Sequence, residues 1–350
     1  MTLKTKVIIS GSVILIFLFL LIRPYWSFVN NTLHVSILKT LFSKDSLKTY
    51  DDQVNILLLG IAGGKHDGPN LSDSIVVANY NFKTNKLTTI SIPRDIWSDT
   101  LEDKINSAYA YGEAKKPKGG GFILSKAEVE AIVGLPIQYS AVIDFDQFKE
   151  LIDYLGGVEV EVENSFVDKK FPIAGKENDE CNGDKTFACR YETVSFKKGV
   201  THMDGTAALN FVRSRNAEGD EGTDFAREKR QQKVMNAAQN KIFSLAIKMD
   251  LTTLKKLYGI MDKLVKRDIT NQQAALIAKN AFFRGKFKQE KISLSENFFT
   301  NPPLYDNGYN GLLVLVPSDK DYTLIHKYID CRIKALPGCD KLENEGKKDQ

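Results

Sequence analysis

The chain has 350 residues, of which 43% are hydrophobic and 26% are charged, an ordinary globular composition that is long enough for one large or two small cores. Its formal net charge of +4 is too slight to argue for nucleic acid, and no block of five or six Lys and Arg residues marks a basic arm. We therefore expect no nucleic acid among its partners.

The N-terminus carries an apolar run that predicts a membrane anchor. Two lysines precede the uncharged run Val7–Ile22, and Arg23, Tyr25 and Trp26 follow it. The run is slightly short for a bilayer core, but flanking basic side chains can snorkel, and Tyr and Trp suit the interface. A cleavable signal peptide is the alternative, yet no small-x-small cleavage site follows. We expect a single-pass anchor within residues 1–26, with the N-terminus in the cytoplasm and the rest outside.

Residues 27–51 are mixed in character and predict a stalk or entry helix between membrane and domain. Beyond them, Ser74–Tyr80 and Leu87–Ile92 are rich in β-branched residues, and the polar residues 81–86 between them predict a β-hairpin. The start of one hairpin strand and the end of the other lie side by side. We therefore expect Asp73 and Arg94 to be neighbours in space.

A glycine-rich loop leads into the same corner. The apolar strand predicted at Ile56–Leu59 ends at Gly60, and residues 60–68 run from it towards Asp73. A carboxylate can bind a hard cation, and an arginine can donate two hydrogen bonds to phosphate oxygens. This edge of the sheet thus favours metal-assisted phosphate chemistry. The loop is one residue too short for an NTPase phosphate loop, and His66 stands where Ser or Thr should bind magnesium.

Helices and strands alternate over the next residues. Ser125–Val133 predicts a helix that begins with a capping box of Ser125 and Glu128. The following elements are expected to be a strand, an amphipathic helix and a short strand, at Ile137–Ile143, Phe145–Leu155 and Val158–Val162. Strands that alternate with helices favour an α/β layered sheet.

A long helix is predicted at Phe225–Met249 with Asp224 as its cap, after a shorter helix at Asp204–Val212. Its apolar stripe has helical spacing and includes Arg227 and Gln231 at the end where the helix dipole is positive. An anion is the natural partner of such inward polar groups, although Arg227 paired with a core carboxylate is the alternative.

The last hundred residues predict a C-terminal extension over 250–340 that packs on the main domain. Its expected elements are two helices and a strand, at Leu251–Val265, Asn271–Gly285 and Gly311–Val316. A disordered tail is expected over residues 341–350.

The four cysteines form two pairs that are close in sequence. Cys181 and Cys189 lie in the polar residues 164–200, which predict a surface insertion, and Cys331 and Cys339 lie near the C-terminus. Outside the cytoplasm an even number favours disulfides, and the two local pairings are favoured among three connectivities. A zinc site or free thiols are the alternatives, but neither spacing is that of a zinc knuckle.

Eight short motifs in order resemble those of the LytR-CpsA-Psr family. They lie at residues 55–60, 72–74, 91–95, 104–112, 144–148, 155–158, 212–215 and 224–232, so the likeness covers roughly residues 52–245. The resemblance implies a central mixed β-sheet flanked by helices in an α-β-α arrangement, with a catalytic domain over residues 52–249. It also implies a phosphotransferase that moves a glycopolymer from polyprenyl pyrophosphate to a sugar hydroxyl of peptidoglycan or another cell-envelope glycan.

The resemblance also implies which residues contact the pyrophosphate: Arg94, Arg213, Arg215, Arg227 and Gln231. Guanidinium groups suit this role because their planar fork matches phosphate oxygens and never deprotonates. Arg94 and Asp73 are the expected catalytic residues. The general base is not identified, with Asp95 and Asp144 as possibilities.

Asp73 matches the family's magnesium-ligating aspartate, and the expected cofactor is Mg²⁺ or Mn²⁺. The family's arginine two residues earlier is Leu71 here, and Ala62 stands where another aspartate is usual. Asp67 in the same loop is the expected substitute ligand, with a turn role for Asp67 as the alternative. The lipid needs an apolar tunnel, for which the runs Val129–Leu135, Ile137–Ile143 and Phe148–Leu155 are candidates; ordinary core explains these runs equally well.

Three other functions remain to be separated from transfer. A pyrophosphatase would use water in place of the sugar hydroxyl in the same site. The departures from the family motif at Leu71 and Ala62 favour a non-catalytic module that binds wall polymer. A transcriptional regulator, suggested by older family names, is disfavoured by the anchor and by the absence of a helix-turn-helix signature or a strongly basic face.

Overall fold

The computed structural model describes residues 19–42, 47–64, 68–173, 175–176, 178–247, 250–285, 288–294, 296–303, 307–319 and 321–345. The predicted anchor run Val7–Ile22 lies outside the described residues up to position 18, and residues 19–27 are helical. Within the described part of the chain, no helix has both the length and the apolar character that crossing a membrane requires.

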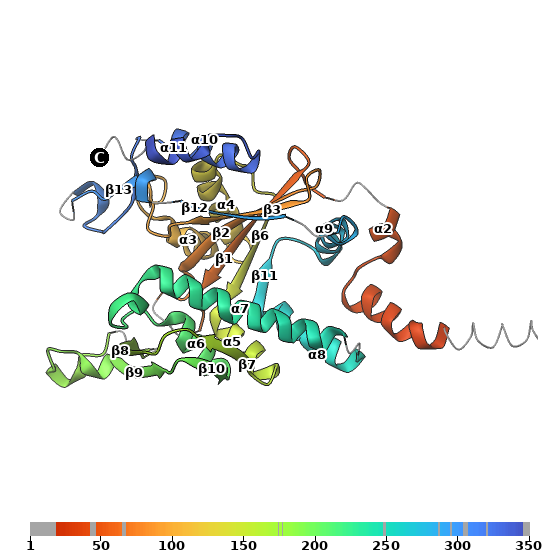
Figure 1. Ribbon diagram of the computed structural model, residues 1–350, viewed down its shortest axis with the longest axis horizontal. Helices are drawn as coiled ribbons and strands as arrows, with labels where there is room; N and C mark the ends of the chain where they lie inside the picture. Colours follow the sequence, from red (N-terminus) through yellow and green to blue (C-terminus); the bar gives the residue numbers. More distant parts are fainter. Residues whose placement is uncertain are drawn as a thin grey trace, which may run out of the picture.

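A six-stranded sheet forms the centre of the fold, in the order β11-β6-β1-β2-β3-β12 (Figure 1). Its strands are β1 (Gln53–Ile61), β2 (Ser72–Asn81), β3 (Lys86–Ile92), β6 (Tyr139–Asp144), β11 (Val265–Arg267) and β12 (Lys288–Ser293). The pairs β1–β6 and β3–β12 are parallel, and the other pairs are antiparallel. The expectation of a central mixed sheet is therefore confirmed.

The hairpin of β2 and β3 forms where the sequence predicts it. Ile75 lies opposite Ile92, and Asn81 lies opposite Lys86. The Asn81 side chain accepts hydrogen bonds from the backbone N–H groups of Lys83 and Thr84, which closes the turn. Asp73 and Arg94 thus both lie just beyond the last pair at the open end of the hairpin.

Helices cover both faces of the sheet. One face packs against α3 (Ala108–Lys115), α4 (Gly120–Val133), α10 (Thr323–Ile333) and α11 (Cys339–Glu345) (Figure 1). On the other side lie α5 (Phe145–Tyr154), α6 (Gly205–Arg213), α7 (Asp224–Ile247), α8 (Leu251–Leu264) and α9 (Asn271–Phe283). A second hydrophobic core lies among the helices α5, α6, α7 and α8 and two short strands. These strands, β7 (Val158–Val162) and β10 (Gly199–Met203), pair antiparallel.

Both predicted disulfides are present, Cys181–Cys189 and Cys331–Cys339. The first closes the tip of a hairpin of β8 (Phe166–Pro172) and β9 (Tyr191–Phe196), within the predicted surface insertion. The second joins α10 to the start of α11 and is buried. α11 extends through residues 341–345, the beginning of the segment expected to be a disordered tail.

Three local expectations are wrong. α4 begins at Gly120 and not at Ser125, so Ser125 is buried within the helix and cannot cap it. α7 begins at Asp224, so the residue before its first turn is Thr223, whose Oγ1 accepts the hydrogen bond from the Ala226 N–H. Only β14 (Val316–Pro317) is a strand near Gly311–Val316, because the segment before it runs over the surface with Leu312 and Leu313 exposed.

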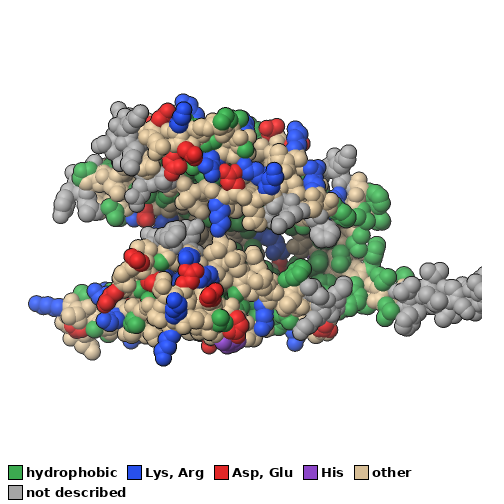
Figure 2. Space-filling model, in the orientation of Figure 1, with side chains coloured by type: hydrophobic (Ala, Val, Ile, Leu, Met, Phe, Trp, Pro, Cys, Tyr) green, Lys and Arg blue, Asp and Glu red, His purple; other side chains and the backbone are tan. Residues whose placement is uncertain are grey.

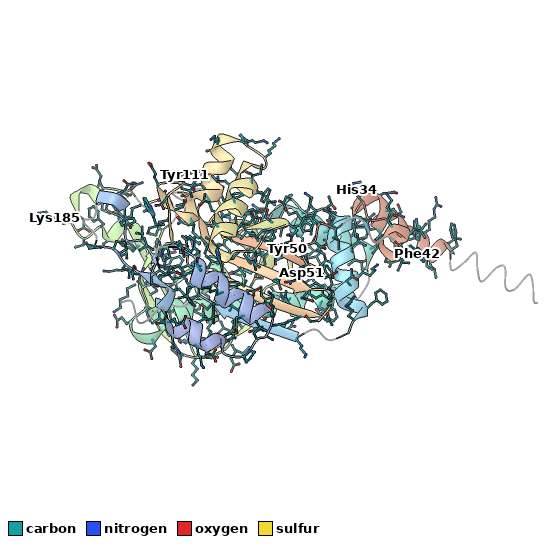
Figure 3. The ribbon with its side chains drawn as sticks, turned by 90° about the horizontal axis from the view of Figure 1, so that it is seen from above. His34, Phe42, Tyr50, Asp51, Tyr111 and Lys185 are labelled. Carbon is teal, nitrogen blue, oxygen red and sulfur yellow. A yellow bond between two sulfur atoms is a disulfide. The ribbon has the colours of Figure 1, made fainter. Side chains whose placement is uncertain are left out.

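The residues after the N-terminal helix pack against the domain. The short helix α2 (Ile37–Phe42) follows, and Gln272 on α9 accepts a hydrogen bond from the Ser36 N–H and donates one to Thr40 Oγ1. Phe28 packs edge-on against Tyr258 of α8. In Figure 3, His34 and Phe42 lie at one end of the molecule, while Lys185 of the β8–β9 hairpin lies at the opposite end.

Candidate active site

A row of alternating charges lies at the open end of the β2–β3 hairpin. Arg94 pairs with Asp73, as the hairpin predicts, and Arg94 Nε lies 3.6 Å from Asp95 Oδ2. Lys104 Nζ donates to Asp95 Oδ1 at 2.7 Å. The side chains of Arg94 and Asp73 are 27% and 44% exposed, so both can reach a ligand. The prediction that Asp73 and Arg94 are neighbours in space is therefore confirmed.

A segment near the C-terminus forms hydrogen bonds with the backbone around Asp95. The sequence analysis did not predict this contact. The Leu315 N–H donates to the Asp95 carbonyl, and the Trp97 N–H donates to the Leu315 carbonyl. The Trp97 ring also packs edge-on against Tyr309. These backbone contacts fix the course of the chain directly after Arg94.

The loop after β1 runs against two acidic side chains at the start of α5. Gly63 and Gly64 have φ values of +69° and +60°, and a Cβ at either position would overlap the carboxylate of Asp144 or Asp146, respectively. Glycine is therefore required on two counts. Asp144 accepts hydrogen bonds from the Asp146 and Gln147 N–H groups and caps α5. Asp67, the expected substitute metal ligand, lies outside the described residues.

The Arg-Ser-Arg motif forms a turn between α6 and α7. Arg213 is the last residue of α6, Ser214 is fully buried, and Arg215 follows it. Asp168 on β8 is also fully buried, and its Oδ2 accepts from Ser214 Oγ at 2.7 Å and from the N–H groups of Arg215 and Asn216 at 3.1 Å each.

Arg230 on α7 holds the same turn from the other side. It donates to the carbonyls of Phe211 and Ser214, at 2.9 and 2.6 Å, and to Glu221. Burial lowers the pKa of Arg230, while the Glu221 and Asp168 carboxylates oppose this shift. Neither Arg230 nor Asp168 was predicted as a functional residue, because Arg230 lies off the predicted apolar stripe of α7 and Asp168 lies in a polar insertion.

Contacts from α7 connect this turn to the sheet. Arg227 and Gln231 are half-buried in the first part of the helix, and Val234 and Ala238 further along are buried, as the predicted stripe requires. Lys291 on β12 donates to the Gln232 side chain at 2.8 Å. Since β12 lies beside β3, this contact places the start of α7 next to the strands that carry Asp73 and Arg94.

A hollow separates the layer that contains the sheet from the helices below it, and Lys and Arg side chains are visible inside (Figure 2). The strands explain its apolar wall. Along β1, β2 and β3 the residues that face α4 and α10 are buried, whereas most of those between them are half-buried; Val54 and Tyr80 are exceptions, because they form a small core of their own. Leu58, Val76 and Ser91 form one such half-buried row, because Val76 pairs with both others.

The runs proposed to line a lipid tunnel are core instead. Val129, Ile132 and Ile137 belong to the core between sheet and α10, and Leu151 and Ile152 belong to the core below. Residues on these runs are buried against other helices, so they cannot line an open space. The half-buried residues of β1–β3 lie on the opposite face of the sheet from α4 and α10, the side on which α7 lies.

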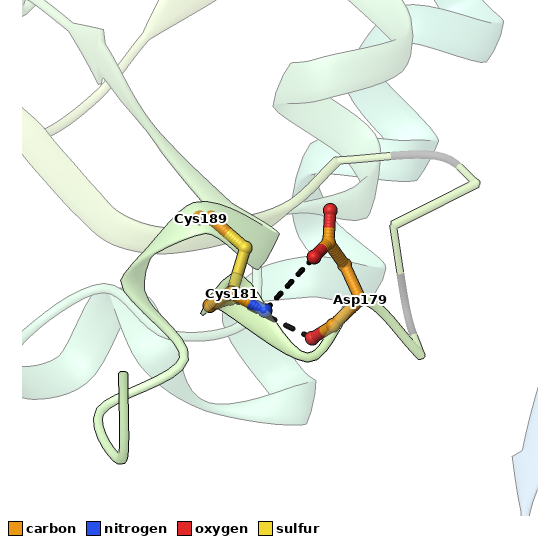
Figure 4. Close-up of side chains that lie close together, drawn as sticks. All are labelled: Asp179, Cys181 and Cys189. Atoms are coloured by element: carbon orange, nitrogen blue, oxygen red, sulfur yellow. Dashed lines mark hydrogen bonds between the residues drawn. A yellow bond between two sulfur atoms is a disulfide. The ribbon is translucent and has the colours of Figure 1, made fainter. Parts of the chain in front are cut away.

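Among the described residues, one group of three side chains has potential metal-ligand atoms close together. Asp179, Cys181 and Cys189 have ligand atoms within 4.8 Å of one another (Figure 4). The two sulfur atoms are bonded to each other, so neither is a thiolate that could bind a metal. This group is a disulfide turn, stabilised by the hydrogen bond from the Cys181 N–H to the Asp179 carboxylate.

The model of the LytR_cpsA_psr family matches residues 30–324. The polyisoprenyl-teichoic acid–peptidoglycan teichoic acid transferase TagU of Bacillus mycoides is 32% identical over 233 residues, which are 65% of this chain and 64% of that protein. The match thus spans less than two thirds of this curated relative.

Solved structures share the fold. The crystal structure of B. subtilis TagV has a TM-score of 0.52 at 24% identity, over 83% of this chain and 100% of that one. A structure of TagT bound to LIIa-WTA has a TM-score of 0.50 at 24% identity, over 81% and 93% of the two chains. At such identities the likeness concerns the fold alone.

Proposed function

Because the chain belongs to the LytR-CpsA-Psr family, we propose that it is a phosphotransferase that moves a glycopolymer from polyprenyl pyrophosphate to a sugar hydroxyl of peptidoglycan or another cell-envelope glycan. One observation supports this proposal: the Asp73–Arg94 pair, which solvent can reach, lies at the end of the strands β2 and β3, whose half-buried face includes apolar side chains such as Val76. A lipid with a charged headgroup needs this combination of surfaces.

In the proposed reaction, an oxygen of the acceptor sugar attacks the phosphorus that carries the glycopolymer. The bond from that phosphorus to the bridging oxygen breaks, and polyprenyl phosphate leaves while the hydroxyl proton is released. Little covalent chemistry is asked of the protein, which must orient the phosphates and balance their charge. Arg94 acts from the sheet, and Arg213, Arg215, Arg227 and Gln231 act from the turn and helix opposite.

The pairing of Arg94 with Asp73 matters for this role. In the ligand-free protein each balances the charge of the other. A pyrophosphate draws Arg94 towards its oxygens because a bidentate guanidinium–phosphate contact is strong. Asp73 then gains a free carboxylate oxygen in the same step, so anion binding at Arg94 prepares a cation ligand beside it.

Asp73 fits a divalent cation of the kind that phosphate sites use. Mg²⁺ is often held by one or two carboxylates together with substrate phosphates and water, so a single exposed carboxylate next to the pyrophosphate is sufficient. Bound Mg²⁺ or Mn²⁺ would neutralise charge on the phosphates. Asp73 is the proposed ligand, with Asp67 of the loop after β1 as the second.

Neither candidate for a general base is free of other contacts. Asp95 is held by Lys104 and lies near Arg94, and Asp144 caps α5. We therefore assign no base. We also propose that the helix at residues 19–27 continues a single-pass anchor, with the N-terminus in the cytoplasm and the catalytic domain outside.

Transfer is tested with purified full-length protein, a lipid-linked oligosaccharide pyrophosphate and peptidoglycan fragments. Arg94→Ala should lower the rate constant for transfer by roughly 10²–10³-fold, the usual cost of removing one donor that stabilises charge in the transition state. The matched control is Arg267→Ala, which removes an arginine of β11 that pairs with Asp262 of α8. Equal activity of Arg94→Ala and Arg267→Ala would contradict the mechanism.

Product analysis separates the alternatives. A transferase gives glycan joined to the acceptor through one phosphate, whereas a pyrophosphatase gives free glycan phosphate whether or not acceptor is present. A protein that binds the lipid but releases neither product is a binding module. Mass spectrometry of the purified protein should also detect a co-purified polyprenyl phosphate.

A further inference from the structure

Asp168 and Arg230 are a pair of buried charged residues that the proposed reaction does not use directly. They are 0% and 4% exposed, come from β8 and α7, and lie on opposite sides of Ser214. Asp168 accepts from the Ser214 hydroxyl, and Arg230 donates to the Ser214 carbonyl. One buried serine is therefore held at both its side chain and its backbone.

The contacts on each side are nearly complete. Asp168 accepts three hydrogen bonds from residues 214–216 through Oδ2 and a fourth, at 3.0 Å, from the Lys170 N–H through Oδ1. Arg230 has hydrogen bonds from all three of its nitrogens, and its guanidinium lies 4.8 Å from the centre of the Phe166 ring. Buried charges are stable only with such full sets of partners.

The position of this pair shows what it restrains. Arg213 and Arg215 flank Ser214, and the Arg215 N–H itself donates to Asp168. We propose that Asp168 and Arg230 are positioning residues, which hold the backbone of the 213–216 turn so that Arg213 and Arg215 meet the pyrophosphate in one geometry. This inference rests on the proposed function and deepens it.

Asp168 and Arg230, together called the clamp, have two physical effects on the 213–216 turn. The clamp holds the Asp168 carboxylate beside the backbone between Arg213 and Arg215. This negative charge offsets part of the repulsion between the two guanidinium groups, while Arg230 and Glu221 neutralise each other. It also removes backbone freedom before the ligand arrives, so less order has to be imposed on binding. A displacement of about 1 Å at a reacting group can cost about 100-fold in rate.

The decisive experiment is a double-mutant cycle on binding of geranylgeranyl pyrophosphate, measured by calorimetry with the full-length protein. Ser214→Ala removes the hydroxyl that Asp168 holds and should weaken binding about 10-fold. In a background that carries both Arg213→Ala and Arg215→Ala, the same change should weaken binding less than about 2-fold, because both side chains that the clamp positions are gone. In the Arg94→Ala background the full effect should remain, since Arg94 lies on the sheet.

The result that overturns the clamp is equal effects of Ser214→Ala in the background that lacks Arg213 and Arg215 and in the Arg94→Ala background, because general destabilisation would act on both alike. Hydrogen exchange supplies a readout without ligand: Asp168→Asn should speed exchange of the Arg215 and Asn216 amides, and unchanged exchange there also refutes the clamp. Asp268→Asn is the control, since Asp268 likewise accepts a backbone N–H, from Ser140 on β6.

The two hypotheses fail in different ways. If the wild-type protein binds the prenyl pyrophosphate but transfers no glycan, the proposed function is wrong, while the cycle still decides the clamp. If Asp168→Asn does not fold, Ser214→Ala carries both the cycle and the exchange measurement, because it deletes a single hydroxyl.

Discussion

Two glycines in helices should respond to alanine with opposite signs. Gly112 lies in α3, where a Cβ would be 2.4 Å from the Gly120 carbonyl oxygen of α4. Gly259 lies in α8, where a Cβ would meet nothing within 4 Å. Alanine gains about 1 kcal/mol over glycine within a helix from backbone entropy alone. The surroundings therefore decide the outcome at each position.

The magnitude at Gly112 follows from the obstacle. The neighbouring atoms are backbone atoms of Gly120 and Gly121, so no side chain can turn away and α3 must move from α4 by about 1 Å. Overpacking of this kind costs typically about 1–3 kcal/mol, and more when only backbone can yield. We expect Gly112→Ala to lower the free energy of unfolding by about 1–2 kcal/mol net, and Gly259→Ala to raise it by about 0.5–1 kcal/mol.

Denaturant unfolding followed by circular dichroism checks both variants against the wild type. The two substitutions add the same methyl group, so the difference in sign isolates the contact between α3 and α4. If Gly112→Ala is as stabilising as Gly259→Ala, the two helices are not in backbone contact and the reasoning is refuted.

Three further predictions concern charge and cysteine chemistry. Two lysines of α7, Lys229 and Lys233, lower the pKa of Glu163 to about 2, so the contribution of the Glu163 carboxylate to stability is complete above pH ~4.5 and is lost as the pH falls towards 2. The melting temperature of Glu163→Gln should therefore lie below that of the wild type at pH 7 and equal it near pH 2. A difference in melting temperature that stays constant between these pH values would contradict this. Mild reductant with an alkylating agent should label the disulfide of the β8–β9 hairpin before the buried one between α10 and α11, as peptide mapping will test. Arg94→Lys should recover only part of the activity lost in Arg94→Ala, since lysine supplies a charge without the planar fork; full recovery would exclude a bidentate contact.

Local sequence patterns were sufficient to predict the strands that bring Asp73 and Arg94 together. The hairpin of β2 and β3 follows from β-branched runs around a polar turn, and its register brings Asp73 to Arg94 without further information. The amphipathic helix α5 and the two local cysteine pairs were equally predictable. In each case the partners are close in sequence or joined by one turn.

The missed features depend on partners that are distant in sequence. β12 is polar and alternating, with Ile292 as its buried residue, and it becomes a strand because β3 offers an open edge. Thr223 takes the cap of α7 that Asp224 was expected to supply, one residue away, which is within the precision of such signals. Arg230 was missed because its partners, Phe211 of α6 and Ser214 in the turn after it, are distant in sequence.

The strand order of the central sheet constrains when the protein can fold during its synthesis. The edge strands β11 and β12 both come from residues after 264, whereas the four strands between them are complete by residue 144. A growing chain therefore holds β3 and β6 with unpaired backbone edges while more than a hundred further residues are made. Open edges of this kind recruit other chains. If the domain crosses a membrane during synthesis, its sheet closes only after residue 293 has emerged, and a nascent chain that stops before residue 288 retains an unpaired edge at β3.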